Sequence, residues 1–483
     1  MLAVFMAAVE VTIVSTAMPT IVSELGGFRL FSWVFAAYLL AQGVSTPLYG
    51  RLADLHGRKP VFVVGAIVFL VGSAACGFAQ NMFWLVLFRI FQGFGAGSIQ
   101  SIAITIVGDI YPANQRAKVQ GWLSSVWGVA AIAGPALGAF IVQHLHWAFV
   151  FWINLPIGIA AIGILALCLD ETVPRREHRI DLLGAALLMF GAGAVLVAIV
   201  QADTLDAAVS ILLLIAGLTA LALLFFQERR AAEPIVPFQL WRSRIMAIGN
   251  IGSLVIGAML MCIVAFLPTY MQGVMGRSVT VAGAIIGGQS VAWSVGSILS
   301  ARVMAATSYR TSGVIGGLGL IAGAALLIVL DRDSGLLHLS LAALLVGLGM
   351  GFCNQTLLIA VQSNVGWSER GIATASILFM RTIGQVLGAS IGGAILNFGI
   401  ADLVAGSDQA LNRLLDPATR DTIDAKTALS LSNAIGTSLH QVYVIAGLLA
   451  VIVLIAMLMI PTRLSPGREA ESHQSDGAKL SAD

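Results

Sequence analysis

Charged side chains are scarce in this sequence. Asp, Glu, Lys and Arg make up 10% of its 483 residues, and 58% of the residues are hydrophobic, whereas an ordinary soluble domain is about 25% charged. The formal net charge is only +2, so we expect no basic surface of the kind that binds nucleic acid. The composition predicts an all-α integral membrane protein.

Motifs for metal, nucleotide or covalent chemistry are also missing. The four cysteines lie in separate apolar runs without CxxC spacing, which favours buried apolar side chains over a metal site. The glycine run "GLGMG" at 347–351 has no GK[ST] after it, unlike a phosphate-binding loop. We therefore expect no enzyme, no metal and no cofactor.

Long apolar runs are what the sequence does contain. A run of about 20 residues spans a bilayer, and the first, from Met1 to about Val22, is too long for the core of a signal peptide. The pattern predicts fourteen spans, which start near residues 1, 30, 60, 82, 116, 146, 182, 208, 243, 279, 311, 336, 370 and 435.

Lys and Arg are unevenly distributed between the predicted connections. With both termini inside, eighteen of them fall on inner segments and six on outer ones. Basic residues are enriched in cytoplasmic loops. We therefore expect a multi-pass protein of the cell (inner or plasma) membrane with both termini in the cytoplasm.

A weak internal repeat relates the two ends of the chain. A shift of 254 residues brings five positions onto residues of the same type: Gly95, Gly97, Arg116, Gly134 and Gly138 meet Gly349, Gly351, Arg370, Gly388 and Gly392. The shift equals eight spans, so the copies run in the same direction, as in transporters with parallel repeats. The repeat predicts two six-helix bundles related by a pseudo-two-fold axis along the membrane normal, with two inserted helices.

These observations divide the chain into four parts. We expect an N-terminal bundle at 1–170, linkers and the two inserted helices at 171–237, a C-terminal bundle at 238–462 with a long outer loop at about 401–434, and a disordered cytoplasmic tail at 463–483.

The stretch "GRLADLHGRKPVF", residues 50–62, resembles the signature loop of the major facilitator superfamily. It matches at Gly50, Leu52, Ala53, Asp54, Gly57, Arg58 and Lys59. The resemblance implies an inner gate, in which Asp54 faces the start of the span near Arg370 and Arg58 pairs with Asp109. The alternative is an ordinary hairpin that basic residues anchor on the inner side.

Further stretches resemble one branch of that superfamily. "GVAAIAGPALGAF", residues 128–140, is similar to the antiporter signature at Gly134, Pro135 and Gly138, although glycines four residues apart also serve close helix packing. "HWAFVFWINLPIG" (146–158) and "RIDLLGAALL" (179–188) resemble segments of the fourteen-span EmrB/QacA drug:proton antiporters.

Glu10 is an acid within the first span. At 1.5 Å per residue it lies about 15 Å from the start of the helix, where a charge costs at least about 2.5 to 3.5 kcal/mol. Its surroundings, "VEVTIVSTAMPTI", resemble the D-x-T-x-x-N-x-A-L-P segment of the same branch. The resemblance implies that Glu10 lies on a cavity-lining helix and carries the coupling proton. The alternative is a hydrogen bond to a neighbouring helix.

Arg89, in "LFRIFQGFGAG", is a second charge inside a span. A guanidinium stays protonated, so we expect it to modulate a nearby acid or a gate, unless it only extends toward the membrane surface. In the second half the predicted substrate cavity has no acid. Its candidates are Gln289, Ser290, Trp293, Asn354, Gln355, Gln362 and Arg381, the last of which could also be structural.

The sequence predicts proton-coupled efflux of lipophilic or monocationic drugs and toxic compounds by alternating access. A dedicated exporter of a natural product or lipid is an alternative, and a proton-coupled nutrient importer is another. The expected partners are a small-molecule substrate, protons and the lipid bilayer, and the expected state is a monomer without nucleic acid.

Overall fold

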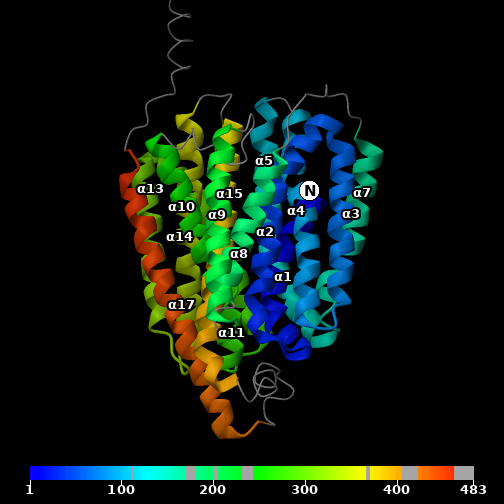
Figure 1. The fold of residues 1–483 in the computed structure, drawn as a ribbon. Helices are drawn as coiled ribbons and strands as arrows, with labels where there is room; N and C mark the ends of the chain where they lie inside the picture. Colours follow the sequence, from blue (N-terminus) through cyan, green and yellow to red (C-terminus); the bar gives the residue numbers. More distant parts are fainter. Residues whose placement is uncertain are drawn as a thin grey trace, which may run out of the picture.

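The computed structural model describes residues 1–110, 113–169, 181–200, 205–230, 243–365, 370–404 and 423–461, and these ranges contain helices and no strand (Figure 1). The first half comprises α1 (Leu2–Leu25), η1 (Phe28–Leu30), α2 (Phe31–His56), α3 (Arg58–Gly77), α4 (Met82–Ile110), α5 (Ala113–His144), α6 (Phe149–Trp152) and α7 (Asn154–Cys168). Next come α8 (Leu182–Val200) and α9 (Ala207–Arg230). The second half comprises α10 (Arg244–Val264), α11 (Leu267–Thr269), η3 (Tyr270–Val274), α12 (Val279–Ala306), α13 (Tyr309–Ile328), α14 (Leu336–Asn364), α15 (Arg370–Val404) and α17 (Ala425–Met459).

Thirteen of the predicted span starts lie within three residues of the start of a helix. The exception is the last helix, expected near residue 435, because α17 already begins at Ala425. Asp424 caps it, since its carboxylate accepts a hydrogen bond from the Thr427 N–H at 3.2 Å. The segment expected as an outer loop therefore includes the first turns of α17 and the end of α15, and residues 405–422 lie outside the described ranges.

Many of these helices suit a bilayer. Eleven segments of the described chain are long and apolar enough to cross a membrane, and two shorter apolar helices occur at Gly128–His144 and Leu183–Ile199. Large apolar side chains also remain exposed on the outside, among them Leu167, Leu212 and Leu337. A multi-pass membrane protein accounts for both features, because lipid replaces water around such side chains.

The helices pack in two groups. In the first group α2 and α3 contact α4, α1 contacts α5, and α7 contacts α1 and α3. In the second, α14 contacts α12 and α13, α15 contacts α10, and α17 contacts α10 and α13. The groups meet where α5 contacts α12 and where α2 contacts α15.

Helices α8 and α9 lie in front of the boundary between the groups (Figure 1). They pack on each other, and α8 also contacts both α2 and α15. Asp181 joins their ends, because its Oδ1 accepts hydrogen bonds from the Gly184 N–H at 2.8 Å and from Gln227 Nε2 at 3.2 Å. This pair of helices therefore contacts both groups, through α2 and through α15.

Candidate functional site

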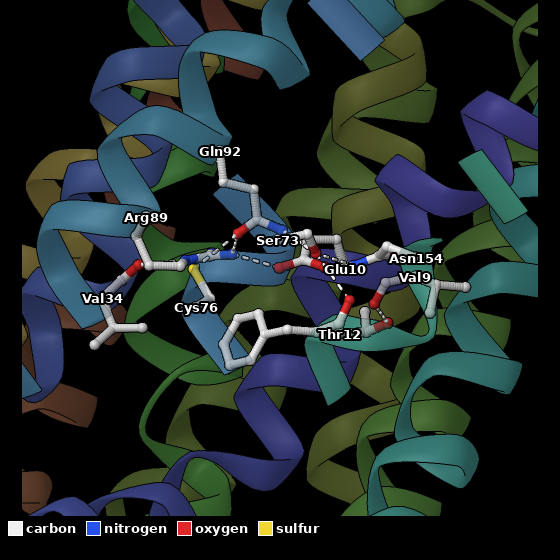
Figure 2. A network of polar contacts seen from close by, with 10 residues as sticks. Val9, Glu10, Thr12, Val34, Ser73, Cys76, Arg89, Gln92 and Asn154 are labelled. Carbon is white, nitrogen blue, oxygen red and sulfur yellow. Dashed lines mark hydrogen bonds and ion pairs between the residues drawn. The ribbon is translucent and has the colours of Figure 1, made fainter. Parts of the chain in front are cut away.

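Glu10 lies on the inward face of α1 and is completely buried. Figure 2 shows its carboxylate among side chains of three other helices. Oε1 pairs with Arg89 Nη1 of α4, and Oε2 accepts a hydrogen bond from Asn154 Nδ2 of α7 at 2.5 Å. The acid thus faces the interior of the first helix group rather than lipid.

Arg89 has partners on several sides. Besides Glu10, its Nη1 donates to Gln92 Oε1 at 2.7 Å, and its Nε donates to the Val34 carbonyl of α2 at 3.0 Å. The guanidinium carbon lies 3.9 Å from the centre of the Tyr38 ring, a distance that suits a cation–π interaction. A buried charge is tolerated when it is both paired and hydrogen-bonded, and Arg89 meets both conditions.

Ser73 of α3 connects the remaining polar groups. Its hydroxyl accepts hydrogen bonds from Asn154 Nδ2 and from Gln92 Nε2, both at 3.0 Å. It donates to the Phe151 carbonyl at 2.8 Å. One network therefore ties α1, α3, α4 and α7 together, and hydrogen bonds in such a buried chain strengthen one another.

The network can do one kind of chemistry, which is to exchange a proton at Glu10. The carboxylate is its acidic member. In this conformation Glu10 and Arg89 are both sealed from solvent. The predicted exposure of Glu10 to a cavity therefore needs a different conformation, in which α1 or its neighbours have moved.

Glycines of α5 hold α1 in place just beyond Glu10. A Cβ at Gly134 would lie 1.9 Å from Thr12 Oγ1, and one at Gly138 would lie 3.0 Å from the Ile13 carbonyl oxygen. Pro135 of the same helix faces the other group, because a Cβ at Gly283 of α12 would lie 2.8 Å from its carbonyl oxygen. The predicted antiporter positions thus lie between the acid-bearing helix and the second helix group.

The predicted inner gate is only partly described. Gly57 has φ +100° and forms the turn between α2 and α3, where glycine is favoured. Arg58 Nη1 donates to the Ala53 carbonyl at 3.0 Å, and Lys59 Nζ donates to the Leu169 carbonyl at 3.1 Å. A Cβ at Gly50 would meet no atom within 4 Å.

The side chains of Asp54, Asp109 and Arg370 lie outside the described residues, so the gate contacts stay a prediction.

The polar candidates of the second group do not form one network. Gln289 is buried, and its Oε1 has no hydrogen-bond partner in the described chain. Trp293, Asn354 and Gln355 are half-buried. Ser290 donates to the Ile286 carbonyl of its own helix at 3.0 Å, and Gln362 of α14 donates to Thr374 of α15 at 2.9 Å. Arg381 is half-buried, and its Nε is sealed from solvent without an acceptor.

The sequence did not identify Asn154, Ser73 and Tyr38 as members of the site. Asn154 stood in a quoted stretch, "HWAFVFWINLPIG", as a lone amide in an apolar run, which is a usable signal because polar residues inside membranes are costly. Ser73 carried no comparable signal, since small hydroxyl residues often bond to their own helix backbone.

Comparison with known proteins agrees with this architecture. The model of the Major Facilitator Superfamily matches residues 1–389. The multidrug transporter protein MdtP of Bacillus subtilis is 35% identical, over 82% of this chain and 74% of its own. Multidrug resistance protein 3 of the same organism is 31% identical, over 95% of this chain and 93% of its own. Among solved structures, an inward-facing, unoccupied bacterial homologue of the human lysosomal transporter Spinster superposes with a TM-score of 0.71, at 15% identity over 96% of this chain and 97% of its own.

Proposed function

Because this chain belongs to the Major Facilitator Superfamily, a family of transporters rather than enzymes, we propose that it exports lipophilic or monocationic drugs and toxic compounds in exchange for protons. Two relatives whose names state multidrug transport or resistance support export. The proposed setting is the cell membrane, with a monomer whose termini both lie in the cytoplasm.

We assign the chain to the fourteen-span EmrB/QacA branch. In this assignment two six-helix bundles related by a pseudo-two-fold axis rock about a central site, and α8 and α9 are the inserted pair. The contact of α5 with α12 and the contact of α2 with α15 support this assignment, because each joins a helix of the first group to a helix of the second. The inner gate of Gly50, Asp54, Gly57, Arg58, Lys59 and Asp109 would close the cytoplasmic side.

The pair formed by Glu10 and Arg89 is the observation that carries the proton-coupling proposal. When a path to Glu10 opens, protonation removes the negative charge that the Arg89 guanidinium faces. The pair then loses its Coulombic attraction, and the contacts that tie α1 to α4 and α7 weaken. Breaking a buried pair costs about 3–5 kcal/mol, so protonation of one group changes the balance between conformations.

The membrane potential can drive this exchange when the exported compound is neutral. One proton that enters across 100 mV supplies about 2.3 kcal/mol. Because about 1.4 kcal/mol corresponds to a factor of ten, one proton sustains a gradient of roughly fifty-fold for a neutral compound exchanged one for one. A single carboxylate such as Glu10 is therefore sufficient for useful export.

Variants of Glu10 test the proposal in everted membrane vesicles. The probes are rhodamine 123, a cationic xanthene dye, and fluorescein, an anionic one. We expect Glu10→Gln to abolish proton release induced by either dye and Glu10→Asp to retain part of it. Glu24→Gln is the matched control, since Glu24 lies on the same helix with its side chain 46% exposed.

A double variant separates coupling from folding. Glu10→Gln leaves Arg89 as an unpaired buried cation, so the single variant should also unfold at a lower temperature. Adding Arg89→Gln removes that charge and should restore much of the thermal stability, but not the coupling. Proton release at the wild-type rate from either folded variant would refute a coupling role for Glu10.

A further inference from the structure

Arg381 is a cation without a partner inside the second helix group. It lies eight residues into the membrane segment Ala373–Ile400, which is about 12 Å along the helix. Its side chain has no hydrogen-bond or ion-pair partner in the described chain, and its Nε is sealed from solvent. At that depth a charge without a counter-charge is costly, so Arg381 requires a partner that the described residues do not supply.

The position of Arg381 on α15 indicates where that partner would bind. Thr374, Leu378, Arg381 and Gln385 are spaced three or four residues apart, so they share one face of the helix, and each is half-buried. Gln362 of α14 donates to Thr374 on this face, so the face points toward α14 and not toward the outside.

Helix contacts border this face on both sides. The Arg381 carbonyl oxygen lies 2.1 Å from the Cβ that Gly257 of α10 would carry, and Thr382 Cγ2 lies 3.2 Å from the Cβ that Gly43 of α2 would carry. Near Arg381, α15 therefore packs against α10 of its own group and against α2 of the first group, so Arg381 lies close to the boundary between the two groups.

Arg89 and Arg381 differ in their electrical surroundings. Arg89 is neutralised by Glu10, so that pair contributes no net charge. Among the described residues Arg381 has no ion-pair partner, so none of them compensates its positive charge. Glu10 is already occupied and is not free to bind a cationic compound, while Arg381 repels one.

We propose that Arg381 is a binding site for an acidic group of the transported compound, such as a carboxylate or a phenolate. This inference rests on the proposed export function and narrows its substrates to lipophilic acids in preference to fixed monocations. A guanidinium suits the task, because its planar fork of N–H donors binds a carboxylate through two parallel hydrogen bonds. Gln385, one turn further along α15, is half-buried and offers a neutral amide beside it.

The proposal also predicts how transport depends on membrane potential. Exchange of a monocation for one proton moves no net charge, whereas export of a monoanion against an entering proton moves two charges in the same direction. A membrane potential therefore accelerates the second exchange and leaves the driving force of the first unchanged.

The test uses the full-length protein in everted vesicles with an imposed proton gradient, and uptake of fluorescein and of rhodamine 123 is measured by rapid filtration. We expect faster uptake of fluorescein and a further increase when a potassium diffusion potential, positive in the lumen, is added. Arg381→Gln should raise the KM for fluorescein by about tenfold or more, the effect of losing one charge-assisted hydrogen bond, and Arg381→Lys should retain part of the affinity. Arg302→Gln, an exposed position on α12, is the matched control.

Each outcome decides one question. Unchanged fluorescein kinetics in a folded Arg381→Gln protein, or uptake of rhodamine 123 without fluorescein, would overturn the acidic-substrate inference and leave export intact. Failure of the proton gradient to drive uptake of either dye, with a normal unfolding temperature, would overturn the export function itself. Loss of fluorescein uptake in Arg381→Gln, together with faster uptake of rhodamine 123, would support the inference most directly.

Discussion

Replacing Gly134 by alanine tests whether close packing of α5 on α1 keeps Glu10 in place. The new Cβ would lie 1.9 Å from Thr12 Oγ1, which is 1.5 Å short of the 3.4 Å where ordinary contact begins. Rotation of Thr12 offers little relief, because its hydroxyl would lose the 3.1 Å hydrogen bond to the Val9 carbonyl. Helix α1 must therefore move, and Glu10 lies only two residues from Thr12.

The expected magnitude follows from the size of the overlap. Overpacking of this kind costs about 1–3 kcal/mol, and a displaced α1 also lengthens the contacts of Glu10 with Arg89 and Asn154. We expect Gly134→Ala to lower the unfolding temperature of the protein purified in detergent and to slow proton-coupled dye uptake in everted vesicles.

Two further variants make the comparison specific. Gly163→Ala is the matched control, since its Cβ would meet no atom within 4 Å. Adding Thr12→Ala to Gly134→Ala removes the nearest atom and leaves the residue-12 Cβ at 3.0 Å and the Val9 carbonyl oxygen at 3.2 Å, so part of the stability should return. If Gly134→Ala behaves like Gly163→Ala in both assays, the packing argument is wrong.

Two other predictions concern the hydrogen bonds of individual side chains. Asn154→Leu removes the hydrogen-bond donor to Glu10 Oε2 and to Ser73. We expect it to lower the free energy of unfolding by about 1.5–3 kcal/mol and to slow proton release, as measured by thermal unfolding and in vesicles. Wild-type values in both assays would contradict the role of the network. In the loop between α13 and α14, the Ser334 hydroxyl donates to Asp331 at 2.7 Å and thereby lowers the pKa of that carboxyl group. A lowered pKa contributes stability at pH values above the unfolded-state pKa, and this stability is lost as pH falls through the folded-state pKa. The unfolding temperatures of the wild type and Ser334→Ala should therefore differ at neutral pH and converge below about pH 4. A difference that stays constant with pH would contradict this prediction.

The sequence predicted the helices better than the site. A helix is marked by residues that are neighbours in the chain, whereas the site is formed by residues that are far apart in the chain. Apolar length marks a span locally, and only α17 began far from its expected position, since the polar residues of "LSLSN" concealed its first turns. The individual residues Glu10 and Arg89 were identifiable because charge is rare in apolar runs. Their pairing was not, because 79 residues separate them and Asn154 is 144 residues from Glu10. Such contacts depend on how α1, α4 and α7 pack.

The two places where the helix groups meet, α5 with α12 and α2 with α15, differ because α8 contacts both helices of the second pair. It contacts α2 on one side and α15 on the other, so it bridges the two helices at one place where the groups meet. In the proposed rocking motion, separation of α2 from α15 would move the surfaces of both helices along α8. The surfaces that they expose there would face α8 instead of lipid acyl chains. If the groups rock as proposed, the contacts of α8 with both helices would add to the free-energy barrier of each transport cycle.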